Sequence, residues 1–346
     1  MFHIETRKVQ KTGGSSYIVS LPIDWIKSHN IHEVFNKNGY TLGIISQPDG
    51  NLLITPNPNS EEILKAKEIS VDDIEGYDFL FRILIGAYIM GYSRIIIKSS
   101  KRFETFIRDC VNNFTQIAIG PEIIEESNQI IVIKDLLNPK EMPFEKTIRR
   151  MYILAESMHE DAIEALKTKN KDLAEEIVKR DDEIDRLHWL IGRQSHIVLK
   201  DIILCQKMGV TLQEANQFQI FSKFLERIGD HAVKIARNVA EIIDEDINQT
   251  LVNEISKASE FSLDLLNKSL DAWLQKDIQL ANSNIDLVKD LIKMCEVIPA
   301  KTENFNMESS IAISYIVESI RRTGEYASDI SEIIINSLIE KLEKVC

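Results

Sequence analysis

Four acidic side chains on two successive helical stretches are the residues of this sequence whose types and spacing best suit chemistry. Asp181 and Asp185 lie four residues apart, and Glu226 and Asp230 repeat that spacing in the next stretch. Residues four apart share one face of a helix, so each pair forms an acidic stripe. Like charges at this spacing destabilise a helix, and a multivalent cation between two facing stripes would offset the repulsion. Carboxylate oxygens suit hard cations, so the four residues are predicted metal ligands.

A second interpretation of the same residues stays open. Acidic pairs on helices are commonly solvated faces interleaved with basic side chains, and Lys179, Arg180 and Arg186 lie close enough in sequence to neutralise the first pair. Two histidines near the stripes, His188 and His231, are predicted to be structural or surface residues. The second of these directly follows the last carboxylate and could join a site.

Helical periodicity surrounds these residues from Pro143 to the end of the chain. Breaks fall at Asn170, at Gly209, between residues 244 and 248, at Lys276 and at Pro299. The predicted helices cover residues 145–168, 171–207, 211–244, 249–275, 277–297 and 307–345. Six helices form two antiparallel three-helix bundles, residues 145–244 and 249–346, whose similar lengths indicate an internal duplication.

Residues 226–232, Glu-Arg-Ile-Gly-Asp-His-Ala, resemble the signature of the PhoU family of phosphate-uptake regulators. The resemblance covers about residues 145–345. It implies two repeated three-helix bundles whose paired acidic motifs bind metal ions, with iron, zinc or magnesium as occupants. On the matching positions it assigns the ligands to Asp181, Asp185, Glu226 and Asp230.

The second bundle departs from that pattern. Asp286 and Asp290 repeat the first acidic pair, and Glu325 matches the last carboxylate when the glycines of the two motifs are aligned. Arg321 then occupies the remaining ligand position, and an arginine cannot lose its proton to coordinate a metal. A second metal site at these three acids is therefore expected to be weaker than the first or absent. Arg321 is expected to pair with Asp286 or Asp290.

The N-terminal residues predict a small β-rich module. Strands are expected near residues 8–10, 17–21, 41–47 and 52–55, with a short helix at 24–29. Thr6 to Pro22 is similar to the opening of SpoVT/AbrB domains, and the resemblance covers residues 5–56. It implies a swapped-hairpin barrel formed by two interleaved chains, hence a homodimer, which is reasonable for a unit too small to hold a large core.

Three basic residues make DNA a candidate partner of this module. AbrB-type domains often bind DNA through basic side chains of the first strand, where this chain has Arg7, Lys8 and Lys11. The alternative is a dimerisation scaffold with a solvated basic edge, and it stays open. Residues 31–37 also lack the Gly-Asp turn common in those domains.

Between these parts, residues 61–140 follow a Pro- and Asn-rich linker and predict a small α/β unit of two similar halves. Helices are expected over residues 80–90 and 103–115, and strands over 95–97, 122–125 and 129–133. No catalytic motif occurs in it.

Composition excludes several classes of protein. The net charge of -13 disfavours a whole-protein nucleic-acid binder, since such binding depends on neutralising phosphates. The four cysteines form no CxxC pair, no apolar stretch approaches the roughly 20 residues of a membrane span, and no signal peptide is visible, which together predict a cytoplasmic protein. Nucleotide-binding loops, nucleophile elbows and HExxH motifs are missing, so no enzyme is predicted.

The sequence thus predicts an α+β multidomain protein with domains at residues 1–56, 61–140, 145–244 and 249–346. Its expected function is non-enzymatic regulation of phosphate uptake, as a metal-binding adaptor or sensor for a phosphate transporter ATPase or another signalling protein. The alternatives are a DNA-binding transcription regulator and, less favoured, a carboxylate-metal enzyme. The helices carry one Glu-x-x-His sequence, Glu156 to His159, whereas a di-iron site takes one from each of two helices, which counts against that version of the enzyme.

Overall fold

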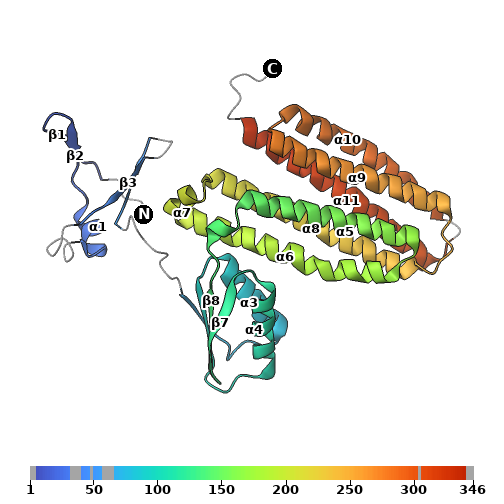
Figure 1. Cartoon of the computed structure of the whole chain (residues 1–346), viewed down its shortest axis with the longest axis horizontal. Coiled ribbons are helices and arrows are strands. Elements are labelled where there is room, and N and C mark those ends of the chain that lie inside the picture. The colour runs from blue at the N-terminus through green and yellow to red at the C-terminus, as the bar shows by residue number, and fades with distance from the viewer. Residues whose placement is uncertain (1–4, 32–39, 47–49, 57–65, 303–304, 340–346) are drawn as a thin grey trace. The chain divides into compact units, whose positions relative to one another are not determined.

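The computed structural model of the chain describes residues 5–31, 40–46, 50–56, 66–302 and 305–339. The chain divides into an N-terminal unit, Met1–Ile63, and a C-terminal unit, Leu64–Cys346 (Figure 1). Most described residues of the C-terminal unit are helical. None of the described helices combines the length and the apolar character needed to cross a membrane.

The N-terminal unit contains two small antiparallel hairpins and one helix. Strand β1 (Gln10–Thr12) pairs with β2 (Ser16–Ile18), and β3 (Gly43–Ser46) pairs with β4 (Leu52–Thr55). Helix α1 (Ile23–Ser28) begins directly after Pro22, whose fixed φ suits the start of a helix. The predicted strands and helix overlap these elements, although β1 begins two residues later than expected. The predicted linker after residue 56, and residues 32–37 of the departure from the AbrB pattern, lie outside the described residues.

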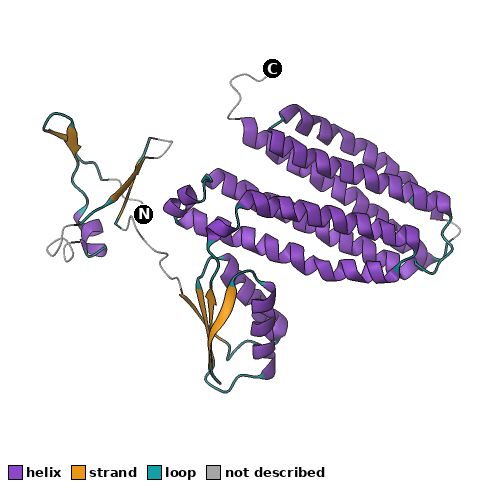
Figure 2. Cartoon of the chain, in the orientation of Figure 1, coloured by secondary structure: helices purple, strands orange, loops and turns teal. Residues whose placement is uncertain are grey.

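The first part of the C-terminal unit is an α/β subdomain, residues 66–135. Its elements are β5 (Ala66–Ser70), α3 (Tyr77–Ile89), β6 (Arg94–Lys98), α4 (Thr105–Ile117), β7 (Pro121–Glu126) and β8 (Ile130–Asp135). The sheet order is β5-β6-β8-β7, with β5 and β6 parallel and the other pairs antiparallel. Figure 2 shows both helices on one side of the sheet. One half is therefore strand-helix-strand and the other helix-strand-strand, so the expected similarity of the halves is wrong.

The rest of the C-terminal unit consists of helices. The long ones are α5 (Phe144–Thr168), α6 (Lys171–Lys200), α8 (Leu212–Ile242), α9 (Gln249–Gln275), α10 (Ile278–Val297) and α11 (Met307–Leu338). Short pieces join them: 3-10 turns at Pro139–Glu141 and Pro299–Thr302, and helix α7 (Ile202–Lys207). All six predicted helices are present.

One predicted helix is interrupted. Residues 171–207 were expected to be continuous, but Asp201 has extended backbone angles and its carboxylate accepts hydrogen bonds from the amides of Ile203 and Leu204. This side chain caps the start of α7 and so competes with continuation of α6, as aspartate does in helix interiors.

Helices α5, α6 and α8 form the first bundle, and α9, α10 and α11 form the second (Figure 1). The bundles meet mainly through α8 and α11, and one continuous cluster of buried apolar side chains runs through both. Aromatic contacts cross the seam, where Phe218 and Phe221 meet the ring of Trp273 at 6.0 and 5.9 Å. This shared core fixes α6 and α8 as a rigid support for the acidic stripes.

Candidate functional site

Helices α6 and α8 bring the four predicted carboxylates into one electrostatic neighbourhood. Asp181 and Asp185 lie on α6, and Glu226 and Asp230 lie on α8, which packs extensively against it. Burial, together with the charges of its three partner carboxylates, raises the pKa of Asp185 to about 7. The four acidic groups therefore lie close enough to interact electrostatically.

The pKa values of Asp230 and Asp181 are raised as well. Burial, Glu226 and Asp181 raise the pKa of Asp230 to about 6, even though Asp230 lies at the exposed edge of the group. Burial and Asp182 raise the pKa of Asp181, while Arg237 lowers it. Repulsion between crowded carboxylates is only partly balanced by nearby cations.

A glycine lets α8 come close to α6 at this point. Gly229 lies between the two carboxylates of α8, and a Cβ atom built on it would be 2.7 Å from Cδ1 of Ile184. Ile184 is fully buried and directly precedes Asp185. The Gly of the Glu-Arg-Ile-Gly-Asp motif thus has a packing role that places both acidic stripes together.

Lysine occupies part of the site. Lys223 Nζ donates to both carboxylate oxygens of Glu226, at 2.9 and 2.8 Å, and the Glu226 side chain is 15% exposed. The sequence interpretation missed this contact, although opposite charges three residues apart on a helix could have revealed it. Of the basic residues considered as neutralising partners, Arg180 instead pairs with Asp161 on α5.

The donor set suits a hard cation, but the side chains do not already surround a common point. Among the described residues, no three or more His, Cys, Asp or Glu side chains form a group that could hold a metal ion. A divalent cation would compensate the repulsion that raises the pKa values of Asp181, Asp185 and Asp230. Binding would require Lys223 to release Glu226 and the acidic side chains to reorient.

The two histidines lie beside the stripes rather than among them. His188 Nδ1 is 3.0 Å from Ser222 Oγ, and burial lowers the pKa of its ring. The ring of His231 faces Tyr326 of α11 at 5.8 Å, and burial lowers its pKa to about 4. Both are placed as structural residues, and His231 lies toward the seam between the bundles.

The second bundle does not repeat this arrangement. Asp286 and Asp290 are exposed and pair with lysines of their own helix, at 3.1 Å to Lys289 and 2.9 Å to Lys293. Arg321 pairs with Glu318 and Glu325, so the expected pairing with Asp286 or Asp290 is wrong.

The position of the aspartates along α10, relative to the residue that packs on the glycine, explains the difference. Gly324 packs against Leu291 of α10, as Gly229 packs against Ile184 of α6. Asp181 lies three residues before Ile184, and Asp185 lies one residue after it. The same steps from Leu291 lead to Val288 and Ile292, which are part of the core or pack against it. Asp286 and Asp290 each lie two residues before these positions, which is about 200° around the helix. The aspartates of α10 therefore face solvent.

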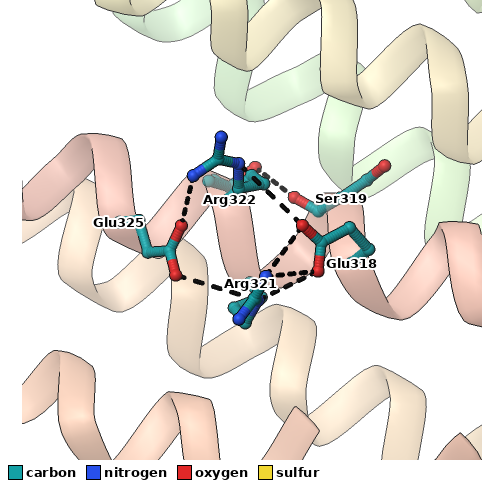
Figure 3. A network of polar contacts seen from close by, with 6 residues as sticks. Glu318, Ser319, Arg321, Arg322 and Glu325 are labelled. Carbon is teal, nitrogen blue, oxygen red and sulfur yellow. Dashed lines mark hydrogen bonds and ion pairs between the residues drawn. The ribbon is translucent and has the colours of Figure 1, made fainter.

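Figure 3 shows the charged network that takes the place of a second acidic cluster. Arg321 Nε and Nη2 donate to Glu318 at 2.9 Å, and Arg322 Nη1 donates to Glu325 at 2.8 Å. Glu325 also lies 3.7 Å from Arg321. Two arginines and two glutamates balance one another, so this part of α11 carries its own counter-charges.

The predicted DNA-binding residues lie at the start of the N-terminal unit. Lys8 and Lys11 are exposed, and Arg7 forms an ion pair with Glu5. Lys11 lies on β1 of the first hairpin, and Lys8 lies two residues before that strand.

Comparisons with known proteins agree with the helical fold. Residues 148–239 match the family model of the PhoU domain. Over 196 residues the chain is 25% identical to the "Phosphate-specific transport system accessory protein PhoU homolog 1" of Thermotoga maritima, an alignment that covers 54% of this chain and 82% of the relative. A PhoU homolog of Aquifex aeolicus is 31% identical over 155 residues, covering 45% and 66%.

A solved structure shows the same fold. The crystal structure of PhoU from Pseudomonas aeruginosa superposes with a TM-score of 0.51 at 22% sequence identity, and the match covers 57% of this chain and 96% of that one. The helical bundles therefore have the fold of that PhoU protein. Both acidic stripes, from Asp181 to Asp230, lie inside the residues that match the PhoU domain model.

Proposed function

We propose that the chain is a non-enzymatic regulator of phosphate uptake, which acts as an adaptor or sensor and restrains phosphate transport. The observation that carries the proposal is the coincidence of the PhoU domain, residues 148–239, with four clustered carboxylates. Relatives named as accessory proteins of phosphate-specific transport systems support it. The protein partner would be the transporter ATPase or another signalling protein of the cytoplasm.

A multivalent cation is the proposed cofactor of the first bundle. Iron, zinc or magnesium would be held by Asp181, Asp185, Glu226 and Asp230. Burial and mutual repulsion raise the pKa values of the three aspartates. The bound ion would supply positive charge that draws α6 and α8 together and would displace Lys223. The acidic residues of the second bundle, with their own lysine and arginine partners, are not included in this proposal.

Metal analysis of the purified chain tests the cofactor. Replacing both Asp185→Asn and Glu226→Gln removes two charges from the stripes, and we expect metal content to fall at least about tenfold, since paired carboxylates supply the affinity. Asp286→Asn with Asp290→Asn removes the same charge from the exposed face of α10 and should leave metal content unchanged. Equal metal content in both double variants would remove the site from the proposal.

Phosphate uptake in cells tests the regulatory role. Cells that lack the chain should take up phosphate without restraint, the wild-type chain should restore control, and the Asp185→Asn, Glu226→Gln variant should fail to restore it. The α10 double variant should restore it fully. Normal uptake in cells without the chain would contradict the proposed function, whatever the metal content.

We also propose that the chain is a homodimer joined through its N-terminal unit. Large apolar side chains are exposed there, with Val9 67%, Tyr17 68%, Ile44 65% and Leu52 64% exposed. A unit of this size that leaves such side chains in water needs a partner surface. Tyr17→Ser with Ile44→Ser should shift the sedimenting mass toward the monomer at low protein concentration, and an unchanged mass would contradict the proposal.

The exposed lysines on and just before the first hairpin favour a second candidate function, transcription regulation through DNA. Lys8 and Lys11 from two chains would form a positive surface on an acidic protein. Gel shifts with promoters of phosphate-uptake genes, at low and high salt, test this function. Loss of binding in Lys8→Gln, Lys11→Gln would support it, and absence of any shift at low salt would remove it.

A further inference from the structure

An acidic groove runs between the two bundles, on helices that carry neither the stripes of α6 and α8 nor the network of α11. It has a volume of about 520 Å³ and lies between α5 and α9. Its acidic residues are Glu156, Glu160, Asp161 and Glu164 of α5 and Glu260 and Asp264 of α9, and Lys167 is the one basic residue among the lining side chains that the structure describes. The groove is therefore a strongly anionic surface separate from the proposed metal site.

Only part of this negative charge is neutralised. Asp161 pairs with Arg180, Asp264 with Lys268 at 2.5 Å, and Glu260 lies 3.9 Å from Lys167.

The other three acids of the groove, Glu156, Glu160 and Glu164, have no ion pair among the described residues. Of these, Glu156 accepts a hydrogen bond from Asn267 at 2.6 Å. Burial and the neighbouring acids Glu156 and Asp161 raise the pKa of Glu160. The groove thus retains unbalanced charge in the folded chain, which costs stability.

The lining of the groove also includes a buried serine. Ser259 lines the groove and is 2% exposed. Ile163 and Leu263 form the apolar part of the lining and are also buried. A buried hydroxyl beside apolar side chains, below walls of exposed acids, is suited to a bound chain with both polar and aliphatic atoms.

The charge is spread along the groove rather than gathered at a point. Glu156, Glu160 and Glu164 follow one another at four-residue spacing, so their helix positions span about 12 Å along α5. No three acidic side chains of the described residues are grouped as a metal ion would require. Lysines at alternate positions of an extended peptide recur about every 6.6 Å, so three of them span a similar length.

We propose that the groove between α5 and α9 binds a lysine- or arginine-rich segment of a partner protein. The cations would pair with the acids of both walls, the aliphatic stems would lie on Ile163 and Leu263, and Ser259 would hydrogen-bond the segment. This deepens the proposed function, on which it rests, by naming the surface that contacts the partner.

Binding of a designed peptide tests the proposal. The probe is a fluorescent peptide of glutamine and serine with three lysines at alternate positions, and its matched control has glutamine in place of the lysines. Fluorescence anisotropy with the full chain should show salt-sensitive binding of the lysine peptide alone. Failure of the lysine peptide to bind better than the control at low salt would overturn the proposal.

Matched variants locate the binding. Glu160→Gln with Glu164→Gln should weaken peptide binding about five- to tenfold, as expected for two lost charge contacts. Asp286→Asn with Asp290→Asn changes the net charge equally, yet should alter binding less than about twofold, since those acids already have lysine partners. Equal weakening by both double variants would mean general attraction to an acidic protein, and would overturn the proposal.

Two further measurements separate the outcomes. If MgCl2 at about 1 mM displaced the peptide while NaCl of equal ionic strength did not, the groove would be a metal site instead and the proposal would fail. The metal content of the Glu160→Gln, Glu164→Gln variant should equal that of the wild type. Lost peptide binding with normal metal content in the Glu160→Gln, Glu164→Gln variant would confirm the groove. A wild-type chain that binds the peptide but holds no metal in the first bundle would leave the groove standing and refute the proposed cofactor.

Discussion

Asp185 links the acid–base chemistry of the site to the stability of the fold. Its pKa is about 7 in the folded chain, against an ordinary value of 3.8. Because the folded state holds the proton more tightly, Asp185 contributes stability that is fully present below pH 4 and is lost as pH rises through 7. Buried histidines oppose this trend, since the pKa of His159 is lowered to about 3 and that of His231 to about 4.

The effect of Asp185 is therefore best measured as a difference between two chains. Asp185→Asn cannot ionise, so the metal-free variant should gain about 3 kcal/mol of stability relative to the wild type between pH 4.5 and pH 8. The histidines cancel in this difference. Urea unfolding of both chains across this range provides the measurement, and a stability difference that does not grow with pH would contradict the pKa of Asp185.

Residue spacing predicted the composition of the acidic cluster but not its surroundings. The four-residue intervals sufficed to place Asp181 with Asp185, because helical geometry fixes that relation. The same reasoning failed to distinguish this pair from Asp286 and Asp290, which have the same spacing but face solvent. Which face of α10 turns inward depends on packing against Leu291, a tertiary contact that spacing alone does not contain.

At the scale of elements, two glycines set how closely neighbouring helices approach, and they should respond differently to alanine. Alanine gains about 1 kcal/mol over glycine in a helix. At Gly229 the nearest atom to an added Cβ is the mobile end of Ile184, so Gly229→Ala should be nearly neutral. At Gly324 a Cβ would meet Leu291 and, at 3.3 Å, Leu265, so Gly324→Ala should lose about 1–2 kcal/mol. Thermal unfolding of both variants compares them, and equal stability would contradict the packing described for α11.

The elements themselves were largely predictable, and the exceptions have local causes. Six long helices followed from apolar periodicity, since amphipathic patterns persist over many turns. The break at Asp201 was missed because a capping side chain there competes with the helix it interrupts. Strand β5 was also missed, since Ala66–Ser70 has only one buried residue and pairs at the edge of its sheet.

At the scale of the whole molecule, one buried ion pair attaches the α/β subdomain to the first bundle. Arg193 of α6 lies 2.6 Å from Asp135 at the end of β8, and the two side chains are 3% and 9% exposed. The guanidinium also donates to the carbonyl oxygens of Tyr88 and Tyr92, at 2.6 and 3.0 Å. Sequence offered no signal for this contact, because its partners belong to segments with different periodicities that meet only after folding.

Removing the arginine should therefore loosen the subdomain selectively. Arg193→Met leaves Asp135 and two carbonyl groups buried without partners, and it should cost about 3–5 kcal/mol. Arg150→Met, which breaks the exposed pair with Glu183, should cost less than about 0.5 kcal/mol. Hydrogen exchange resolves where the loss falls: amides of α3 and β8 should lose more protection than those of α8 and α11, because the shared core of the bundles does not depend on this ion pair. Uniform loss across all helices would mean that the α/β subdomain and both bundles unfold as a single cooperative body, with the Arg193 ion pair as one of its common supports.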